Sequence, residues 1–151
     1  MPGFRRVLHP ADFSSASRPA FRKAMDLAKS LRGDLVLVHV LPCVVVPMMM
    51  AEGYIPAATL DDLQRTAGAV APRHLNRLVA QAKQAGVRVS SRLVEGSPVD
   101  GRIVRTAKAV HADMIVMGTH GRTDVRRFLL GSGAARVVAT ASCSVLTVRG
   151  R

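Results

Sequence analysis

The 151-residue sequence is poor in aromatic residues, which make up 3% of it and include one Tyr and no Trp. Hydrophobic residues nevertheless make up 48% of the chain, so a core of ordinary size can form from aliphatic side chains. Such a composition favours buried parallel strands flanked by Ala-rich helices, and the length suits a single domain covering residues 1–151. Stacking surfaces for single-stranded nucleic acid are scarce.

Cysteines and long apolar runs are also scarce. The two cysteines, Cys43 and Cys143, form no Cys-x-x-Cys pair, and we interpret them as small apolar fillers in a reducing compartment. The most apolar run, residues 35–50, is shorter than the roughly 20 residues that a membrane helix needs. Residues 1–7 lack the apolar core of a signal peptide. The sequence therefore predicts a cytoplasmic protein with no membrane partner.

Acidic residues are outnumbered, with 10 Asp and Glu against 22 Lys and Arg, for a formal charge of +12. A positive field attracts anions such as nucleotides, nucleic acid or acidic membranes. The basic residues are scattered, however, and a high arginine content can equally reflect genome composition. The charge alone is compatible with a nucleic-acid-binding protein, but the shortage of aromatic residues for stacking disfavours this function.

Apolar runs of strand length alternate with segments of helical period along the chain. Strands are expected at residues 4–9, 35–40, 87–94, 113–117 and 144–148. This alternation predicts a Rossmann-like α/β fold: a doubly wound, five-stranded parallel sheet in the order 3-2-1-4-5 with helices on both faces.

Polar residues and glycines punctuate the expected helices. Caps are expected at Ser17, Thr59, Ser97 and Ser132, with Pro98 at the first helical position after Ser97. Gly33 and Gly86 are expected to end the first two helices, and Pro72 to kink or restart the second.

Ligands of such sheets bind beyond the carboxyl ends of the strands. Three segments would meet there: the turn after the first strand, the end of the second strand, and the residues after the fourth. The candidates in them are Pro10, Ala11, Asp12, Val40, Met117 and Gly118. Asp12 could hold a ribose hydroxyl or a metal, or only cap a turn.

A glycine-rich segment after the fourth strand carries the clearest ligand signal. Gly118 and Gly121 precede Gly131, Ser132 and Gly133, which open the last helix. Glycines allow close approach of a ligand, and a helix start offers N–H groups and a dipole to phosphate. Between them, Arg122 could screen phosphate charge and His120 could touch a phosphate. The alternative is that the glycines only make tight turns.

This glycine pattern resembles the nucleotide-binding signature of the universal stress protein family, in its ATP-binding branch. The similarity extends to residues 7–14, 37–40 and 144–148, and so to nearly the whole chain. It implies a homodimer paired through the last strand: Ser144, Val145, Leu146, Thr147 and Val148.

The resemblance also implies a ligand, ATP or else ADP or AMP, with Mg or Mn at the phosphates. Asp12 and the Val40 backbone would face the adenine end, and Gly118 would lie near the ribose. The phosphates would be held by Gly121, Gly131, Ser132 and Gly133. The sequence departs from the family pattern where Gly133 and Ala134 replace a bulkier residue and a hydroxyl, which removes one phosphate contact.

The resemblance implies a stress-response regulatory protein, a nucleotide-dependent homodimeric switch that meets an unidentified regulatory protein partner. At most slow ATP hydrolysis is expected, because no general base or nucleophile–base pair is evident. The alternatives are a small-molecule enzyme on the same scaffold, catalysing nucleotidyl transfer or ATP hydrolysis, and a charge-driven nucleic-acid binder.

Overall fold

The structure is a computed structural model, and it describes residues 3–43, 57–120 and 130–150. Strands alternate with helices along the chain, as the apolar runs predicted. The elements are β1 (Arg6–Pro10), the short 3-10 helix η1 (Ser15–Ser17), α1 (Arg18–Ser30), β2 (Asp34–Leu41), α2 (Ala57–Gln84), β3 (Arg88–Glu95), α3 (Val99–Ala109), β4 (Met114–Gly118), α4 (Ser132–Thr140) and β5 (Ser144–Val148).

The five strands form one parallel sheet in the order β3-β2-β1-β4-β5, which confirms the predicted topology. β1 lies at the centre, where Leu8 pairs with Val36 on β2 and with Ile115 on β4. β1 begins two residues later than expected, because its pairing with β2 starts at Arg6 and Phe4 is exposed.

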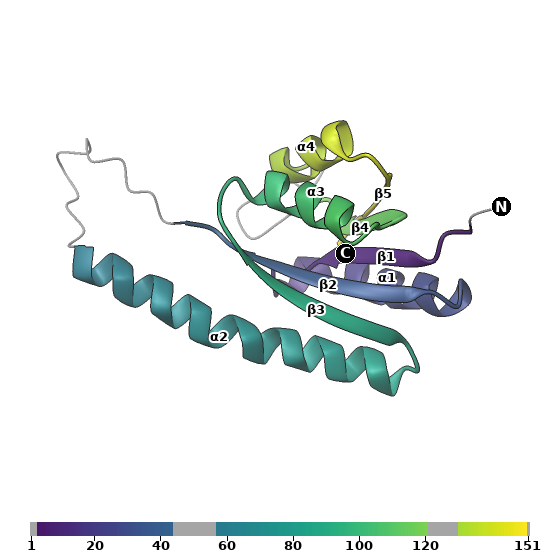
Figure 1. The fold of residues 1–151 in the computed structure, drawn as a ribbon, viewed down its shortest axis with the longest axis horizontal. Helices are drawn as coiled ribbons and strands as arrows, with labels where there is room; N and C mark the ends of the chain where they lie inside the picture. Colours follow the sequence, from purple (N-terminus) through teal and green to yellow (C-terminus); the bar gives the residue numbers. More distant parts are fainter. Residues whose placement is uncertain (1–2, 44–56, 121–129, 151) are drawn as a thin grey trace.

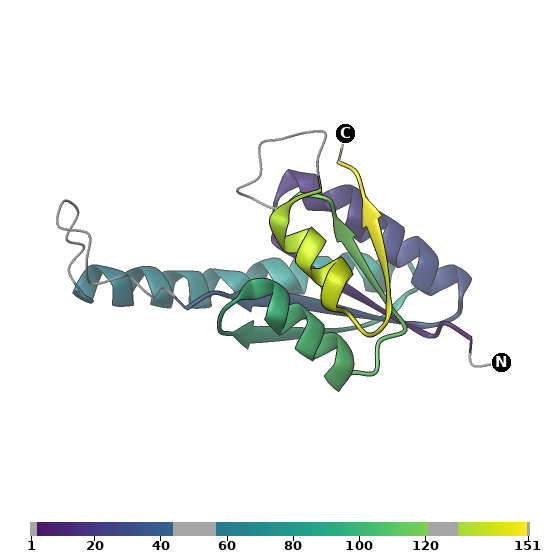
Figure 2. The same ribbon diagram turned by 90° about the horizontal axis from the view of Figure 1, so that it is seen from above.

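Helices cover both faces of the sheet, α1 and α2 on one and α3 and α4 on the other (Figures 1 and 2). One core cluster joins Leu35 and Leu37 of β2 to α1 and α2. The other joins Val36 and Val38 of the same strand to α3 and α4. β2 is therefore buried on both faces, as its largely apolar sequence predicted.

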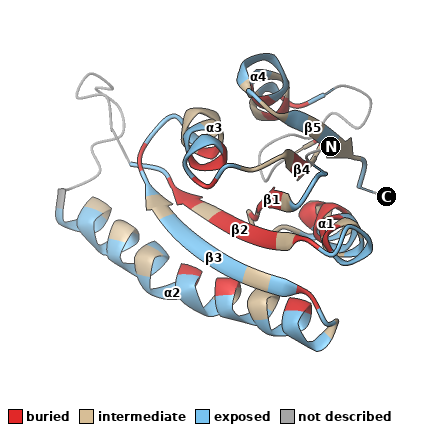
Figure 3. Cartoon of the chain, turned by 45° about the vertical axis from the view of Figure 1, so that its right-hand side comes forward, coloured by how far each residue is buried: buried red, intermediate tan, exposed pale blue. Residues whose placement is uncertain are grey.

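α2 is a single helix of 28 residues that contains Pro72, so the expected restart at Pro72 is wrong. Thr59 lies inside the helix rather than at its cap. The buried residues Ala71, Leu75 and Ala82 all belong to its C-terminal half, whereas its N-terminal half extends past the sheet (Figures 1 and 3). None of the described helices combines the length and the apolar composition needed to cross a membrane.

The expected serine caps are not made. Ser17 has the N-cap position of α1, but its hydroxyl donates to the Ser14 carbonyl. α3 begins at Val99 with Pro98 at the N-cap, and α4 has Gly131 there, so Ser97 and Ser132 do not occupy that position. No side chain caps these three helices, so their first N–H groups depend on other partners.

The end of α1 differs from expectation by one residue. Arg32, with φ 50°, takes the left-handed position that we expected for Gly33. Gly33 comes next and donates its N–H to the Ala28 carbonyl at 2.8 Å. Glycine is needed there for space, because a Cβ atom would overlap the backbone carbonyl oxygen of Arg5.

Gly33→Ala is expected to lower the free energy of unfolding by about 1–3 kcal/mol, because the new methyl group has to displace backbone of the neighbouring segment. Gly68→Ala in α2 is the matched control, since a Cβ there meets nothing within 4 Å. It should raise the free energy of unfolding by about 0.5–1 kcal/mol through helix propensity. Urea titrations of both variants measure this difference, and equal effects would contradict the steric explanation.

Candidate functional site

The carboxyl ends of β1, β2 and β4 lie together at one edge of the sheet. The Ala11 N–H donates to the Val38 carbonyl at 2.8 Å, and His39 Nδ1 lies 2.6 Å from the Ala11 carbonyl oxygen. On the other side, a Cβ placed on Gly118 would lie 3.6 Å from the Ala16 carbonyl oxygen. The turn after β1 therefore lies between the ends of β2 and β4, as the sheet order predicted.

Asp12 shapes this turn. Its Oδ1 accepts hydrogen bonds from the Ser14 N–H at 2.9 Å and the Ser14 hydroxyl at 2.6 Å. The Ser14 hydroxyl in turn accepts from the Ser17 N–H at 3.2 Å, which caps η1. Turn capping, one of the roles foreseen for Asp12, is therefore present, and its Oδ2 takes no part in these bonds.

Phe13 stacks between two histidines beside the turn. Its ring lies 4.3 Å from that of His39 and 4.9 Å from that of His74 on α2, measured between centroids. Phe13 also has φ 63°, a left-handed conformation that is rare for a bulky residue. Sequence reasoning missed this stack, because the three residues are far apart in the chain and carry no shared local signal.

Two backbone hydrogen bonds hold Thr119, the residue after β4, one to the end of β5 and one to the start of α4. The Thr119 N–H donates to the Val148 carbonyl at 3.1 Å, and the Gly131 N–H donates to the Thr119 carbonyl at 2.8 Å. Thr119 and Gly131 therefore hold the end of β4 beside the start of α4, although these two residues are twelve positions apart in the sequence. The predicted site residues Gly121 and Arg122 lie outside the described residues.

The first turn of α4 presents N–H groups that have no partner among the described residues. The first intrahelical bond runs from the Ala135 N–H to the Gly131 carbonyl at 2.9 Å, so the N–H groups of Ser132, Gly133 and Ala134 precede it. No side chain caps this end, and no acidic residue lies in its first turn. A Cβ on Gly133 would meet nothing within 4 Å. This arrangement suits an anion, which the helix dipole also favours.

Two polar side chains follow β4 directly. Thr119 is buried, and its Oγ1 lies 3.0 Å from His120 Nδ1. His120 Nε2 is buried and has no hydrogen-bond partner among the described residues. The sequence indicated His120 through its place in the glycine pattern. Thr119 had no distinguishing feature beyond its position between Gly118 and His120.

His9 is the most perturbed titratable group near this edge. It is fully buried on β1, and burial lowers its pKa to about 4, against smaller opposing effects of the Val116 carbonyl and Asp12. The imidazole is therefore neutral at pH 7. Nδ1 lies 2.8 Å from the Val116 carbonyl oxygen, which can only accept, so Nδ1 carries the proton. Nε2 has no partner among the described residues.

The remaining predicted residues contribute mainly backbone. Val40 is buried against α3, so its side chain is not available to a ligand. Pro10 and Met117 are half-buried at the ends of their strands. Within the described ranges, no three His, Cys, Asp or Glu side chains are grouped to hold a metal ion.

The two cysteines take different positions. Cys143 packs against the cluster between the sheet and α3, and burial raises the pKa of its thiol. Cys43 is exposed, so the expectation that it fills apolar space is wrong; it follows the last buried residue of β2 and lies beyond the sheet.

The doubly wound parallel sheet defines the class of Rossmann-like α/β domains, in which ligand sites lie beyond the carboxyl ends of the strands. Residues 3–149 match the model of the universal stress protein family, and the chain belongs to this family. A universal stress protein of Methanocaldococcus jannaschii is 32% identical over 146 residues, covering 97% of this chain and 82% of the relative.

Solved structures agree in fold. Universal stress protein UspA of Lactobacillus plantarum has a TM-score of 0.82 at 23% identity, covering 99% of this chain and 100% of that one. A universal stress protein in complex with cAMP has a TM-score of 0.67 at 25% identity, covering 99% of both chains. One from Archaeoglobus fulgidus, in complex with dAMP, has a TM-score of 0.66 at 22% identity, covering 99% and 100%.

Proposed function

We propose that this universal stress protein binds an adenine nucleotide at the carboxyl edge of its sheet, ATP in first place and ADP or AMP otherwise. The phosphates rest on the start of α4, the ribose lies near Gly118, and the adenine lies toward Asp12 and the Val40 main chain. The solved relatives with cAMP and dAMP support the class of ligand.

The observation that carries this proposal is the start of α4. Its first three N–H groups have no partner in the part of the chain that the structure describes, and no acidic residue lies in the first turn. The bond from Gly131 to Thr119 fixes them beside the end of β4, next to the turn that Asp12 shapes. Free N–H groups fixed in this way bind phosphate without reorganising.

A divalent metal, Mg or Mn, fits this site as a companion of the nucleotide. Asp12 uses Oδ1 to hold Ser14, which leaves Oδ2 as one oxygen ligand, and hard cations take their other ligands from phosphate and water. Such an ion would neutralise phosphate charge.

The proposed role is that of a nucleotide-dependent homodimeric switch in the stress response. Hydrolysis of ATP would be slow at most, because Asp12 Oδ1 already accepts hydrogen bonds from Ser14, Oδ2 is assigned to the metal, and His9 is buried away from solvent. Mass spectrometry of small molecules released from the purified protein tests the ligand directly. Recovery of an adenine nucleotide at near-stoichiometric amount supports the proposal; failure of added ATP to bind the emptied protein would reject it.

We expect the protein to be a homodimer paired through β5. This strand lies at an edge of the sheet, and its Leu146 is 36% exposed. Unpaired apolar edge strands favour pairing with another chain. Light scattering at tens of micromolar should give twice the 16.1 kDa chain mass. Leu146→Lys should shift the mass toward the monomer, and a strictly monomeric parent protein would contradict the prediction.

A further inference from the structure

The opposite end of the sheet, where the strands begin, contains a hollow that the nucleotide proposal does not use. Its volume is about 450 Å³, within the usual range of small-molecule pockets. Charged residues at the beginnings of β1, β2 and β3 line it together with Val110, which follows α3. It therefore lies at the amino ends of the strands, whereas the nucleotide site lies at their carboxyl ends.

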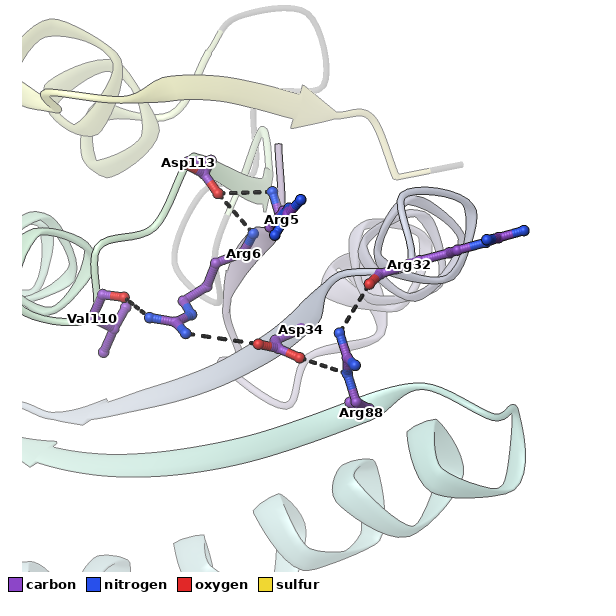
Figure 4. A network of polar contacts seen from close by, with 7 residues as sticks. All are labelled: Arg5, Arg6, Arg32, Asp34, Arg88, Val110 and Asp113. Atoms are coloured by element: carbon purple, nitrogen blue, oxygen red, sulfur yellow. Dashed lines mark hydrogen bonds and ion pairs between the residues drawn. The ribbon is translucent and has the colours of Figure 1, made fainter. Parts of the chain in front are cut away.

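A row of three charged residues closes one end of the hollow. Arg6, Asp34 and Arg88 are register partners on adjacent strands, and Figure 4 shows Asp34 between the two guanidinium groups. Asp34 lies 2.8 Å from Arg88 Nε and 3.7 Å from Arg6 Nη2. One carboxylate thus faces two cations.

The same two arginines are fixed by backbone carbonyl groups. Arg6 Nη1 donates to the Val110 carbonyl at 2.6 Å, and Arg88 Nη2 donates to the Arg32 carbonyl at 2.9 Å (Figure 4). These bonds orient the guanidinium groups without neutralising their charge. The row therefore keeps an excess positive charge in a fixed position.

A third arginine and a hydroxyl group lie further along β3. Ser90 and Arg92 both line the hollow and, being two residues apart on a strand, share a face. Neither side chain makes a hydrogen bond or an ion pair within residues 3–43, 57–120 and 130–150. The hollow thus offers an uncommitted guanidinium fork and a hydroxyl above a floor that includes Val36.

We propose that this hollow is a second ligand site, and that it binds a small molecule through a phosphate group. Three arginines and one aspartate line it, so its own charge is +2, which suits a phosphate dianion. Arginine forks match phosphate oxygens, and the Ser90 hydroxyl supplies a neutral donor. The phosphate belongs either to free inorganic phosphate or to a phosphorylated metabolite whose carbon skeleton covers Val36.

The test uses inorganic phosphate and glucose 6-phosphate as probes. Each is titrated into the full-length protein while ¹H–¹⁵N spectra are recorded, and dissociation constants are measured by calorimetry. Both should shift the amides of Ser90, Arg92 and Val110. Tighter binding of glucose 6-phosphate identifies a metabolite as the ligand, and equal binding identifies free phosphate. Shifts confined to Ser132 and its neighbours would overturn the proposal.

Arg92→Gln should weaken binding at this hollow about tenfold or more, the usual effect of losing a charged hydrogen-bonding partner. The matched control is Arg77→Gln, which removes the same charge from an exposed position on α2, on the other face of the sheet. It should change the dissociation constant less than twofold. Equal losses in the two variants would show only diffuse attraction by net charge and would overturn the site. ATP affinity, measured in parallel, should be unchanged in Arg92→Gln, so this proposal and the nucleotide proposal fail separately.

Discussion

Gly131→Val is expected to weaken ATP binding more than a hundredfold. Gly131 is buried at the N-cap of α4, and its backbone has φ −59° and ψ 153°, which valine can adopt. The effect is therefore steric rather than conformational: a branched side chain would occupy space beside the N–H groups that receive the phosphates. Losing two or three hydrogen bonds to a charged group costs roughly 3–6 kcal/mol.

Titration with a fluorescent ATP analogue measures this loss, with circular dichroism to confirm that the variant is folded. Gly3→Val is the matched control, because a Cβ at Gly3 meets nothing within 4 Å. Gly131→Ala provides a smaller change at the same position if the valine variant does not fold. Unchanged affinity in a folded Gly131 variant would mean that the glycine serves the turn alone, and nucleotide binding at α4 would have to be abandoned.

Acidification is expected to destabilise the protein through His9 by about 3 kcal/mol between pH 7 and pH 4. In the unfolded chain this histidine titrates near its ordinary pKa of 6.5, whereas burial lowers its pKa in the folded state to about 4. Between these values the unfolded chain binds the additional proton, so stability is fully present above pH 6.5 and is lost as the pH falls toward 4. Each pKa unit of difference corresponds to about 1.4 kcal/mol.

Urea denaturation at a series of pH values measures this slope. His9→Leu should flatten it over the same window, whatever the variant's absolute stability, because leucine has no proton to bind. His111→Asn removes an exposed histidine and tolerates the left-handed backbone that His111 adopts, so it should leave the slope unchanged. An identical slope in His9→Leu and in the parent protein would assign the acid sensitivity to other groups.

The strands could be predicted from sequence because the chain signals them locally. Five of residues 35–40 are apolar and only His39 is polar, and this is the pattern of a strand buried on both faces. The sheet order followed from the strict alternation of strands and helices and from the late glycine pattern. Both predictions succeeded because packing of the helices on the sheet favours the same strands that the local sequence favours.

Helix starts could not be predicted as well, because serine hydroxyl groups have several competing partners. Ser17 lies where a cap was expected, yet its hydroxyl donates to the Ser14 carbonyl. At α4, the Gly131 bond to Thr119 decides where the helix begins, and that bond depends on packing between β4 and α4. The local sequence does not indicate this packing.

The candidate site also has features that the sequence predicted and features that it could not predict. The glycine pattern predicted a ligand site between Gly118 and Gly133, and in the structure Gly118 ends β4 while Gly131, at the N-cap of α4, bonds to the next residue, Thr119. The stack of Phe13 between His39 and His74 joins three separate elements, and the pKa of His9 depends on burial under α1. Such features arise only when the whole sheet and its helices are assembled.

The two edges of the described sheet differ in a way that limits how copies of the chain can join. β3, at one edge, carries Arg88, Arg92 and Glu95, whereas β5, at the other, carries no charged residue. Charges on an edge strand oppose pairing with another strand. If two molecules pair β5 with β5, as we propose, a charged β3 would lie at each outer end, and growth would stop at two chains. The same asymmetry would oppose extension of a highly apolar parallel sheet into fibres.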